Sequence, residues 1–186
     1  MNYVQPIRDK QKIKEMKTEL KKRGTRDYLL FITGINTGLR ISDIIKLKVE
    51  DVMNYDRTPK SHIDLIEEKT GKRKVFKIND ILAKEFYEYT KNMEMTQYLF
   101  PSRKGNGHIG RIQAYRILNE VANKIGIQEI GTHTLRKTFG YHFYYDNGKD
   151  IAMLQQLFNH SSPSITKRYI GISQDEIDIA YTNFSL

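Results

Sequence analysis

The sequence predicts a mainly α-helical fold with one small antiparallel β-sheet. Through most of the 186 residues, apolar side chains recur at the three- and four-residue spacing of helices. Only around the turn KTGK does the spacing change to two, in the flanking segments SHIDLIEE and RKVFKIN. A chain of this length fits one ordinary domain, because two domains would each be small. We therefore expect a single domain over residues 1–186.

The N-terminal part is expected to contain consecutive helices. Residues 9–23 form a basic amphipathic helix, and Gly24 is its stop signal. A mostly apolar helix follows and ends near Gly38, after which the segment ISDIIKLK begins another. Arg40 is thus expected at a helix junction.

The rest of the chain is expected to be a hairpin followed by helices. The turn KTGK joins the two short strands and carries Lys69. Asn79 is expected to cap a helix that runs to about Met93, and FPSRKGNGHIG is a loop. Later helices are expected at 111–125, 134–145 and 151–158, with an amphipathic C-terminal stretch in 172–186.

Composition narrows the class of protein. Lys and Arg total 31 against 22 Asp and Glu, and this net charge of +9 suits a polyanionic partner such as nucleic acid. The alternative that solvated Lys side chains simply maintain solubility stays open. The 39% hydrophobic content and the lack of a long apolar run exclude a disordered chain and a membrane protein. The chain has neither cysteine nor an apolar leader, which is compatible with a reducing cytoplasm, and we expect a cytoplasmic protein.

Several common chemistries are disfavoured. The five histidines form no HExxH pattern, and the chain has neither a phosphate-binding glycine loop of the Walker type nor a GxSxG elbow. A metallohydrolase, an NTPase and a common serine hydrolase therefore fit poorly. We expect no cofactor and no metal.

Four residues in three segments are candidates for binding an anion or moving a proton. His133 and Arg136 lie one turn apart at a helix N-terminus, where they could bind phosphate or merely face solvent. Arg40 has Asp43 one turn away, which either forms a structural ion pair with it or orients it toward a ligand. Lys69 is either an ordinary charged hairpin tip or a proton donor that reaches into a cleft.

In order, TGLRISDI, the KTGK hairpin, HTLRKTF, LQQLFNHSS and a following Tyr resemble the catalytic domain of the tyrosine recombinase, or phage integrase, family. The resemblance covers the chain from about residue 7 to its end and implies the DNA breaking-rejoining catalytic-domain fold. Lys137 and Asn159 depart from it, because the family more often has His and Gly there. It places the family's catalytic groups on Arg40, Lys69, His133, Arg136, His160 and Tyr169.

The resemblance implies a site-specific DNA recombinase that integrates, excises or inverts DNA. The two arginines would clamp the non-bridging phosphate oxygens, and both histidines would hydrogen-bond the phosphate, with His133 as general base. Tyr169 would attack phosphorus to form a 3′-phosphotyrosine, and Lys69 would protonate the departing 5′-hydroxyl. Two alternatives stay open: a nicking-religation enzyme similar to topoisomerase IB, and a non-catalytic DNA-binding accessory protein.

The resemblance also implies the partners. Double-stranded DNA is the substrate, and its backbone is expected to meet the first helix and the segment SRKGNGHIGR. We expect a homotetramer on synapsed DNA, with a monomer when free and accessory DNA-bending proteins as further candidates. We expect a bacterial or phage-encoded protein without an N-terminal core-binding domain, similar to the fimbrial phase-variation invertases. The alternative is that the sequence is a fragment of a longer protein. Residues 172–186 are expected to form a tail helix that docks on a neighbouring protomer or packs on its own domain.

Overall fold

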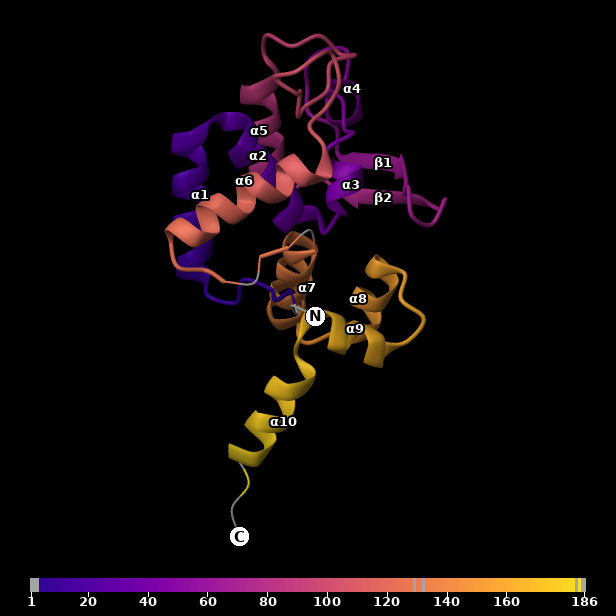
Figure 1. Ribbon diagram of the computed structural model, residues 1–186. Coiled ribbons are helices and arrows are strands. Elements are labelled where there is room, and N and C mark those ends of the chain that lie inside the picture. Colours follow the sequence, from indigo (N-terminus) through magenta and orange to yellow (C-terminus); the bar gives the residue numbers. More distant parts are fainter. Residues whose placement is uncertain (1–3, 129, 132, 183, 185–186) are drawn as a thin grey trace.

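The computed structural model is mainly helical with a two-stranded antiparallel sheet, which confirms the predicted fold class (Figure 1). It describes residues 4–128, 130–131, 133–182 and 184. The helices are α1 (Lys10–Arg23), α2 (Thr25–Thr37), α3 (Ile41–Ile44), α4 (Val49–Val52), α5 (Asp80–Thr90), α6 (Arg111–Lys124), α7 (Thr134–Asp146), α8 (Ile151–Phe158), α9 (Pro163–Ile170) and α10 (Ser173–Thr182). The strands are β1 (His62–Ile66) and β2 (Arg73–Lys77).

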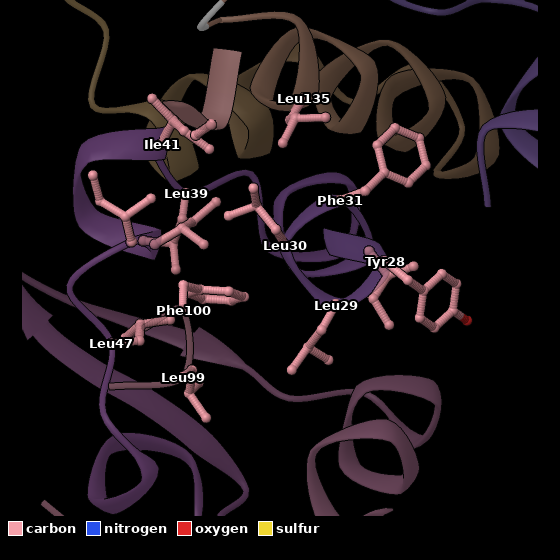
Figure 2. Close-up of a cluster of buried hydrophobic side chains, with 14 of the residues drawn as sticks. Tyr28, Leu29, Leu30, Phe31, Leu39, Ile41, Leu47, Leu99, Phe100 and Leu135 are labelled. Carbon is pink, nitrogen blue, oxygen red and sulfur yellow. The ribbon is translucent and has the colours of Figure 1, made fainter. Parts of the chain in front are cut away.

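Helix α2 forms the centre of the larger hydrophobic core. It is apolar on nearly every side, as expected of a helix surrounded by protein, and it packs against α1, α5 and α7. Leu29, Leu30 and Phe31 are fully buried there, and Phe100 from the loop before α6 lies on the same cluster (Figure 2). This core fixes where the C-terminal end of α2 points, and Arg40 follows that end.

A second, smaller core joins α7, α8 and α9. Tyr144, Leu154, Phe158 and Ile170 are buried in it, while Leu135 at the start of α7 belongs to the larger core. Helix α7 therefore connects the two cores. Its first turn lies where they meet, so side chains from both parts of the domain gather there.

The hairpin pairs His62 with Lys77 and Ile66 with Arg73, so residues 67–72 form the loop that contains KTGK. Strand β2 is tied to α8, because the ammonium of Lys74 lies 3.1 Å from the carbonyl oxygen of Gln156 and 3.4 Å from that of Leu157. A cation at the C-terminus of a helix is favoured by the free carbonyls and the dipole. The loop is thereby held against the C-terminal part of the domain.

Helices α4 and α9 were not predicted from the sequence. Helix α9 has clear end signals: Ser162 accepts a hydrogen bond from the amide of Ile165, Pro163 occupies the first turn, and Gly171 takes the left-handed conformation at the C-terminus. The helix is only eight residues long and buries two side chains, Thr166 and Ile170, so its helical periodicity extends over too short a stretch to predict a helix by itself. Tyr169 therefore lies on a helix, in a segment for which the sequence predicted no secondary-structure element.

Replacing Gly38 with Ala is expected to lower the free energy of unfolding by about 2–4 kcal/mol. Gly38 has a φ of 67°, and an added Cβ would lie 2.4 Å from Cδ1 of Phe139 on α7. Urea denaturation of both this variant and Gly126→Ala measures the effect, because Gly126 has a φ of 73° with open space around it. The control should lose only about 1 kcal/mol. Equal losses in the two variants would show that the clash between the added Cβ and Phe139 does not lower the stability.

Candidate active site

Arg136 is the most deeply buried of the candidate residues. Only 2% of its surface is exposed, and its guanidinium lies 4.2 Å from the ring centroid of Phe158. One nitrogen donates to the carbonyl oxygen of Gly38 at 2.6 Å and another to that of Phe158 at 3.1 Å. These carbonyls end α2 and α8, so the side chain links the two cores. Burial lowers the pKa of Arg136, and the group stays a cation with donors left for an anion.

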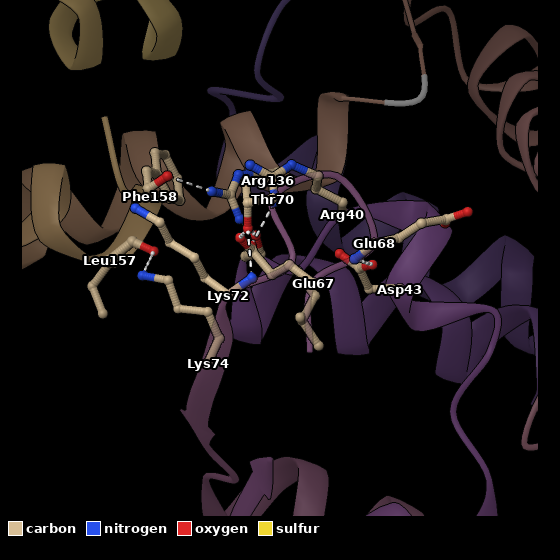
Figure 3. Close-up of polar contacts among 12 residues, drawn as sticks. Arg40, Asp43, Glu67, Glu68, Thr70, Lys72, Lys74, Arg136, Leu157 and Phe158 are labelled. Atoms are coloured by element: carbon tan, nitrogen blue, oxygen red, sulfur yellow. Dashed lines mark hydrogen bonds and ion pairs between the residues drawn. The ribbon is translucent and has the colours of Figure 1, made fainter. Parts of the chain in front are cut away.

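Arg40 lies beside Arg136 and pairs with a carboxylate that the sequence did not suggest (Figure 3). Its Nη1 lies 2.5 Å from Oε1 of Glu67, whose side chain is completely buried. Burial raises the pKa of Glu67, but the hydrogen bonds and charge from Arg40 and Thr70 outweigh it and hold the pKa below its usual value. Glu67 is therefore an ionised carboxylate that orients one arginine of the site.

Asp43 does not form the ion pair considered from the sequence. Its Oδ1 accepts a hydrogen bond from the amide of Glu68 at 3.1 Å, so it supports the hairpin loop from α3. Burial raises the pKa of Asp43, since its other oxygen has no hydrogen-bond partner. Glu67 is the residue that sequence reasoning missed.

Tyr169 points from α9 toward the start of α7. Its hydroxyl oxygen lies 3.3 Å from Nδ1 of His133, the residue that precedes the first turn of α7. Burial raises the pKa of Tyr169, and the charges of Arg136 and Arg40 oppose this rise. Burial also lowers the pKa of His133, helped by Lys69 and the neighbouring cations. A neutral imidazole next to a phenol is an arrangement that can accept its proton.

His160 lies next to Tyr169, with ring centroids 5.1 Å apart. Its Nδ1 is 3.0 Å from the hydroxyl oxygen of Thr166, which fixes the ring. Burial, together with Arg136 and Arg40, lowers the pKa of His160 to about 4, so the ring is neutral near pH 7. The preceding Asn159 has a φ of 55°, a conformation that Asn adopts more easily than most residues other than Gly. Asn159 thus serves at the position where Gly is more usual.

Lys69 lines a pocket of about 370 Å³ together with Arg40 and His133. Its side chain is exposed, and its positive charge lowers the pKa of His133. Arg111, the first residue of α6 and the last of the predicted DNA-contacting segment, lines the same pocket. The structure therefore brings Arg40, Lys69 and His133 to one pocket, with Arg136, His160 and Tyr169 beside it.

Neither a metal centre nor a membrane-spanning helix is found in the described part of the chain. Among those residues, no three His, Cys, Asp or Glu side chains are grouped to hold a metal ion. In the same residues, none of the helices combines the length and the apolar character needed to cross a membrane.

Solved structures with this fold are DNA recombinases and integrases. XerA recombinase superposes with a TM-score of 0.74 at 24% identity, over 97% of this chain and 64% of that one. The catalytic domain of bacteriophage HP1 integrase superposes with a TM-score of 0.62 at 22% identity, over 97% of this chain and 95% of that one. Likenesses at this identity define the fold, that of a tyrosine recombinase catalytic domain.

Sequence comparison defines the family. The profile of the Phage integrase family matches residues 8–176. The probable integrase/recombinase YoeC of Bacillus subtilis is 55% identical over 184 residues, which are 99% of this chain and 98% of that protein. The chain belongs to the phage integrase family, whose members include the tyrosine recombinases, and the resemblance seen in the sequence is confirmed. Tyrosine recombinase XerA of Pyrococcus furiosus is 29% identical over 95% of this chain, which spans 60% of that protein.

Proposed function

We propose that this protein is a site-specific DNA recombinase that cuts and rejoins DNA strands through a 3′-phosphotyrosine. One observation carries the proposal: the hydroxyl of Tyr169 lies 3.3 Å from His133, within the field of Arg40 and Arg136. A nucleophile, a base and two cations are what the transfer of a phosphoryl group to a phenol requires. Family membership supports the same activity.

In the first step, the oxygen of Tyr169 attacks phosphorus and the bond from phosphorus to the 5′-oxygen breaks. The phenolic proton goes to His133, and the departing 5′-oxygen takes a proton from Lys69. Attack of another 5′-hydroxyl on the phosphotyrosine reverses the chemistry and rejoins the strands. The phosphodiester energy is kept in the tyrosine ester, so the exchange proceeds without an added energy source.

The arginines stabilise the charge that develops on the phosphate. Arg136 is held by the two carbonyls and Arg40 by Glu67, so both cations are positioned before the substrate binds. Positioned charges in a partly buried site stabilise a transition state more than mobile ones, because nothing has to reorganise during the reaction. His160, neutral and fixed by Thr166, adds a hydrogen bond to the same phosphate.

Double-stranded DNA is the proposed substrate. The net charge of +9 favours it, and a solved relative by fold, XerH site-specific recombinase, is bound to a palindromic difH substrate. We place the duplex over the pocket that holds Lys69, with Arg111 on its backbone. The residues of SRKGNGHIGR and the basic face of α1 extend the contact with phosphates.

The proposed assembly is a homotetramer on synapsed DNA. Without DNA, the protein is proposed to be a monomer. Helix α10 extends away from the rest of the domain (Figure 1), and its Tyr181 is 77% exposed. Its first turn is anchored because Glu176 accepts from Lys167 at 2.8 Å and from the hydroxyl of Tyr144. The exposed apolar end, with Ile179 and Tyr181, is proposed to dock on a neighbouring protomer rather than on its own domain.

The proposed activity is tested by trapping DNA on the protein. The protein is incubated with nicked fragments of genomic DNA and should form covalent protein–DNA adducts that survive denaturation. Sequencing the DNA attached to the protein then identifies the recombination site. Two copies of that site on one supercoiled plasmid should then be exchanged. Relaxation of supercoils without exchange would instead indicate a nicking-religation enzyme, and the lack of any adduct would indicate an accessory DNA-binding protein.

Lys69→Ala is expected to slow cleavage about 100-fold or more, because the 5′-oxygen then leaves without a proton. A substrate with sulfur in place of the bridging 5′-oxygen should restore the rate, since a thiolate leaves unprotonated. Lys74→Ala is the matched control: its ammonium is bonded to the carbonyls of Gln156 and Leu157. Adduct formation with both substrates measures the effect. A Lys69 variant that the sulfur substrate does not rescue would shift the role to Lys72, or to Lys74 if Lys74→Ala is itself slow and is rescued by sulfur.

A further inference from the structure

An N-terminal strap, residues 4–8, lies beside α7 (Figure 1) and is hydrogen-bonded to it. The amide of Ile7 donates to the hydroxyl of Thr138 at 2.9 Å, and its carbonyl oxygen lies 2.9 Å from Nε2 of His142. Val4 packs on Gly131, where an added Cβ would lie 2.4 Å from a methyl of Val4. The strap therefore braces α7 along its first turns, which carry Arg136.

Lys137 connects this strap to Tyr169. The residue is only 9% exposed, and its ammonium donates to the carbonyl oxygen of Val4 at 2.8 Å. The same nitrogen lies 5.2 Å from the centroid of the Tyr169 ring. Lys is seldom buried unless its charge is satisfied, and here a carbonyl and the face of an aromatic ring satisfy it. No step of the cleavage mechanism described above uses this cation.

We propose that Lys137 is a positioning residue of the cleavage step, a cation that the strap holds over the ring of Tyr169. An ammonium over the ring attracts the phenol and attracts its phenolate more strongly, so it both orients the nucleophile and favours loss of its proton. This inference rests on the proposed function, in which Tyr169 attacks phosphorus.

The strap also holds the far end of α9. A guanidinium nitrogen of Arg8 donates to the carbonyl oxygen of Gly171 at 2.8 Å, directly after the last turn of that helix. Gly171 has a φ of 75°, and an added Cβ would lie 3.3 Å from the same nitrogen of Arg8. The strap thus contacts Lys137 on α7 and, through Arg8, the end of α9. These two contacts help to fix the position of the helix that carries Tyr169 relative to the helix that carries Arg136.

Other charged groups around Tyr169 limit the expected size of the effect. The ammonium of Lys137 acts beside the two arginines, so its removal should slow cleavage rather than abolish it. Lys69 and Lys137 itself both lower the pKa of His133, while Glu67 pairs with Arg40. The titratable and charged groups on the surrounding elements are His133 and Arg136 on α7, His160 between α8 and α9, Arg40 between α2 and α3, and Lys167 and Arg168 on α9 itself.

The test is the pH dependence of adduct formation with a nicked substrate in single-turnover conditions. Loss of a nearby cation raises the pKa of the phenol, so Lys137→Met should react about tenfold more slowly near neutral pH and approach the parent rate at higher pH. Lys137→Arg keeps a cation there and should recover most of the rate. Lys91→Met is the matched control, because Lys91 lies 5.2 Å from the ring centroid of Tyr87 on the surface of α5.

The outcomes separate this inference from the proposed function. If the parent protein forms no adduct, the proposed function fails. If it does, and Lys137→Met reacts at the parent rate or is slowed equally at every pH with no recovery in Lys137→Arg, Lys137 does not position the nucleophile. Binding to an intact duplex and the thermal midpoint are measured for each variant, so that a loss of folding in Lys137→Met is recognised. If Lys137→Met does not fold, the reaction rate of Lys137→Arg tests the inference instead.

Discussion

Tyr169→Phe is expected to abolish the covalent protein–DNA adduct and to leave DNA binding unchanged. The substitution removes one oxygen and keeps the ring, which packs against Phe158 and His160 with centroids 5.6 and 5.1 Å away. The lost hydroxyl has His133 as its partner, so the cost in stability should be about 1 kcal/mol. Cleavage should nevertheless fall below detection, because the phenyl ring offers no nucleophile to phosphorus.

A nicked duplex that traps the phosphotyrosine provides the measurement. The adduct is separated on a denaturing gel, and affinity for intact duplex is measured alongside it. Tyr141→Phe is the matched control, because Tyr141 lies on α7 with its ring 5.4 Å from the guanidinium of Arg8 and takes no part in the proposed reaction. An adduct formed by Tyr169→Phe would assign the nucleophile to a different residue.

The hairpin and α7 could be predicted because their signals are local. Alternating side chains around KTGK predict the pairing that places Lys69 in the loop, and HTLRKTF begins α7 as expected. Helix α9 was not predicted because it is only eight residues long, too short for its amphipathic pattern to be distinguished from a polar loop. Its capping residues Ser162 and Gly171 were the available signal, and they predict the ends of a helix without requiring an apolar stripe.

The partner of Arg40 shows what sequence spacing cannot predict. Asp43 was considered as the partner because it lies one turn from Arg40, yet its carboxylate accepts a hydrogen bond from the amide of Glu68. Glu67 lies 27 positions further along the chain and would ordinarily be an exposed hairpin residue. The packing of the hairpin against the end of α2 buries it, and a buried carboxylate requires a cation. Such a pair is a property of the tertiary structure.

The electrostatics of the site follow from the same packing. Desolvation and the neighbouring cations lower the pKa values of His133 and His160, although part of the His133 side chain is exposed to solvent. Arg40 and Arg136 are cations, and Glu67 is the buried carboxylate between the hairpin and the arginines. The cluster therefore has an excess of positive charge that an entering phosphate would neutralise. The sequence predicted the types of residue in this cluster, but their degree of burial, and with it their pKa values, required the fold.

Arg40→Ala is expected to lose cleavage by about 1,000-fold, since the site then lacks one of its two fixed cations for the phosphate. The same change leaves Glu67 buried without its ion partner, which should cost about 3–5 kcal/mol of stability. A slow variant would therefore be ambiguous by itself. The double variant Arg40→Ala, Glu67→Gln removes the unpaired carboxylate together with the cation and resolves the ambiguity.

In the double variant, urea denaturation should show most of the lost stability recovered, because a neutral amide is less costly to bury than a carboxylate. Adduct formation should stay as slow as in Arg40→Ala, because the phosphate still lacks its second cation. Glu67→Gln alone keeps Arg40 and should remain within about tenfold of the parent rate. Recovery of cleavage along with stability would mean that Arg40 only supports the hairpin, and parallel losses of DNA affinity and cleavage would make it a binding residue.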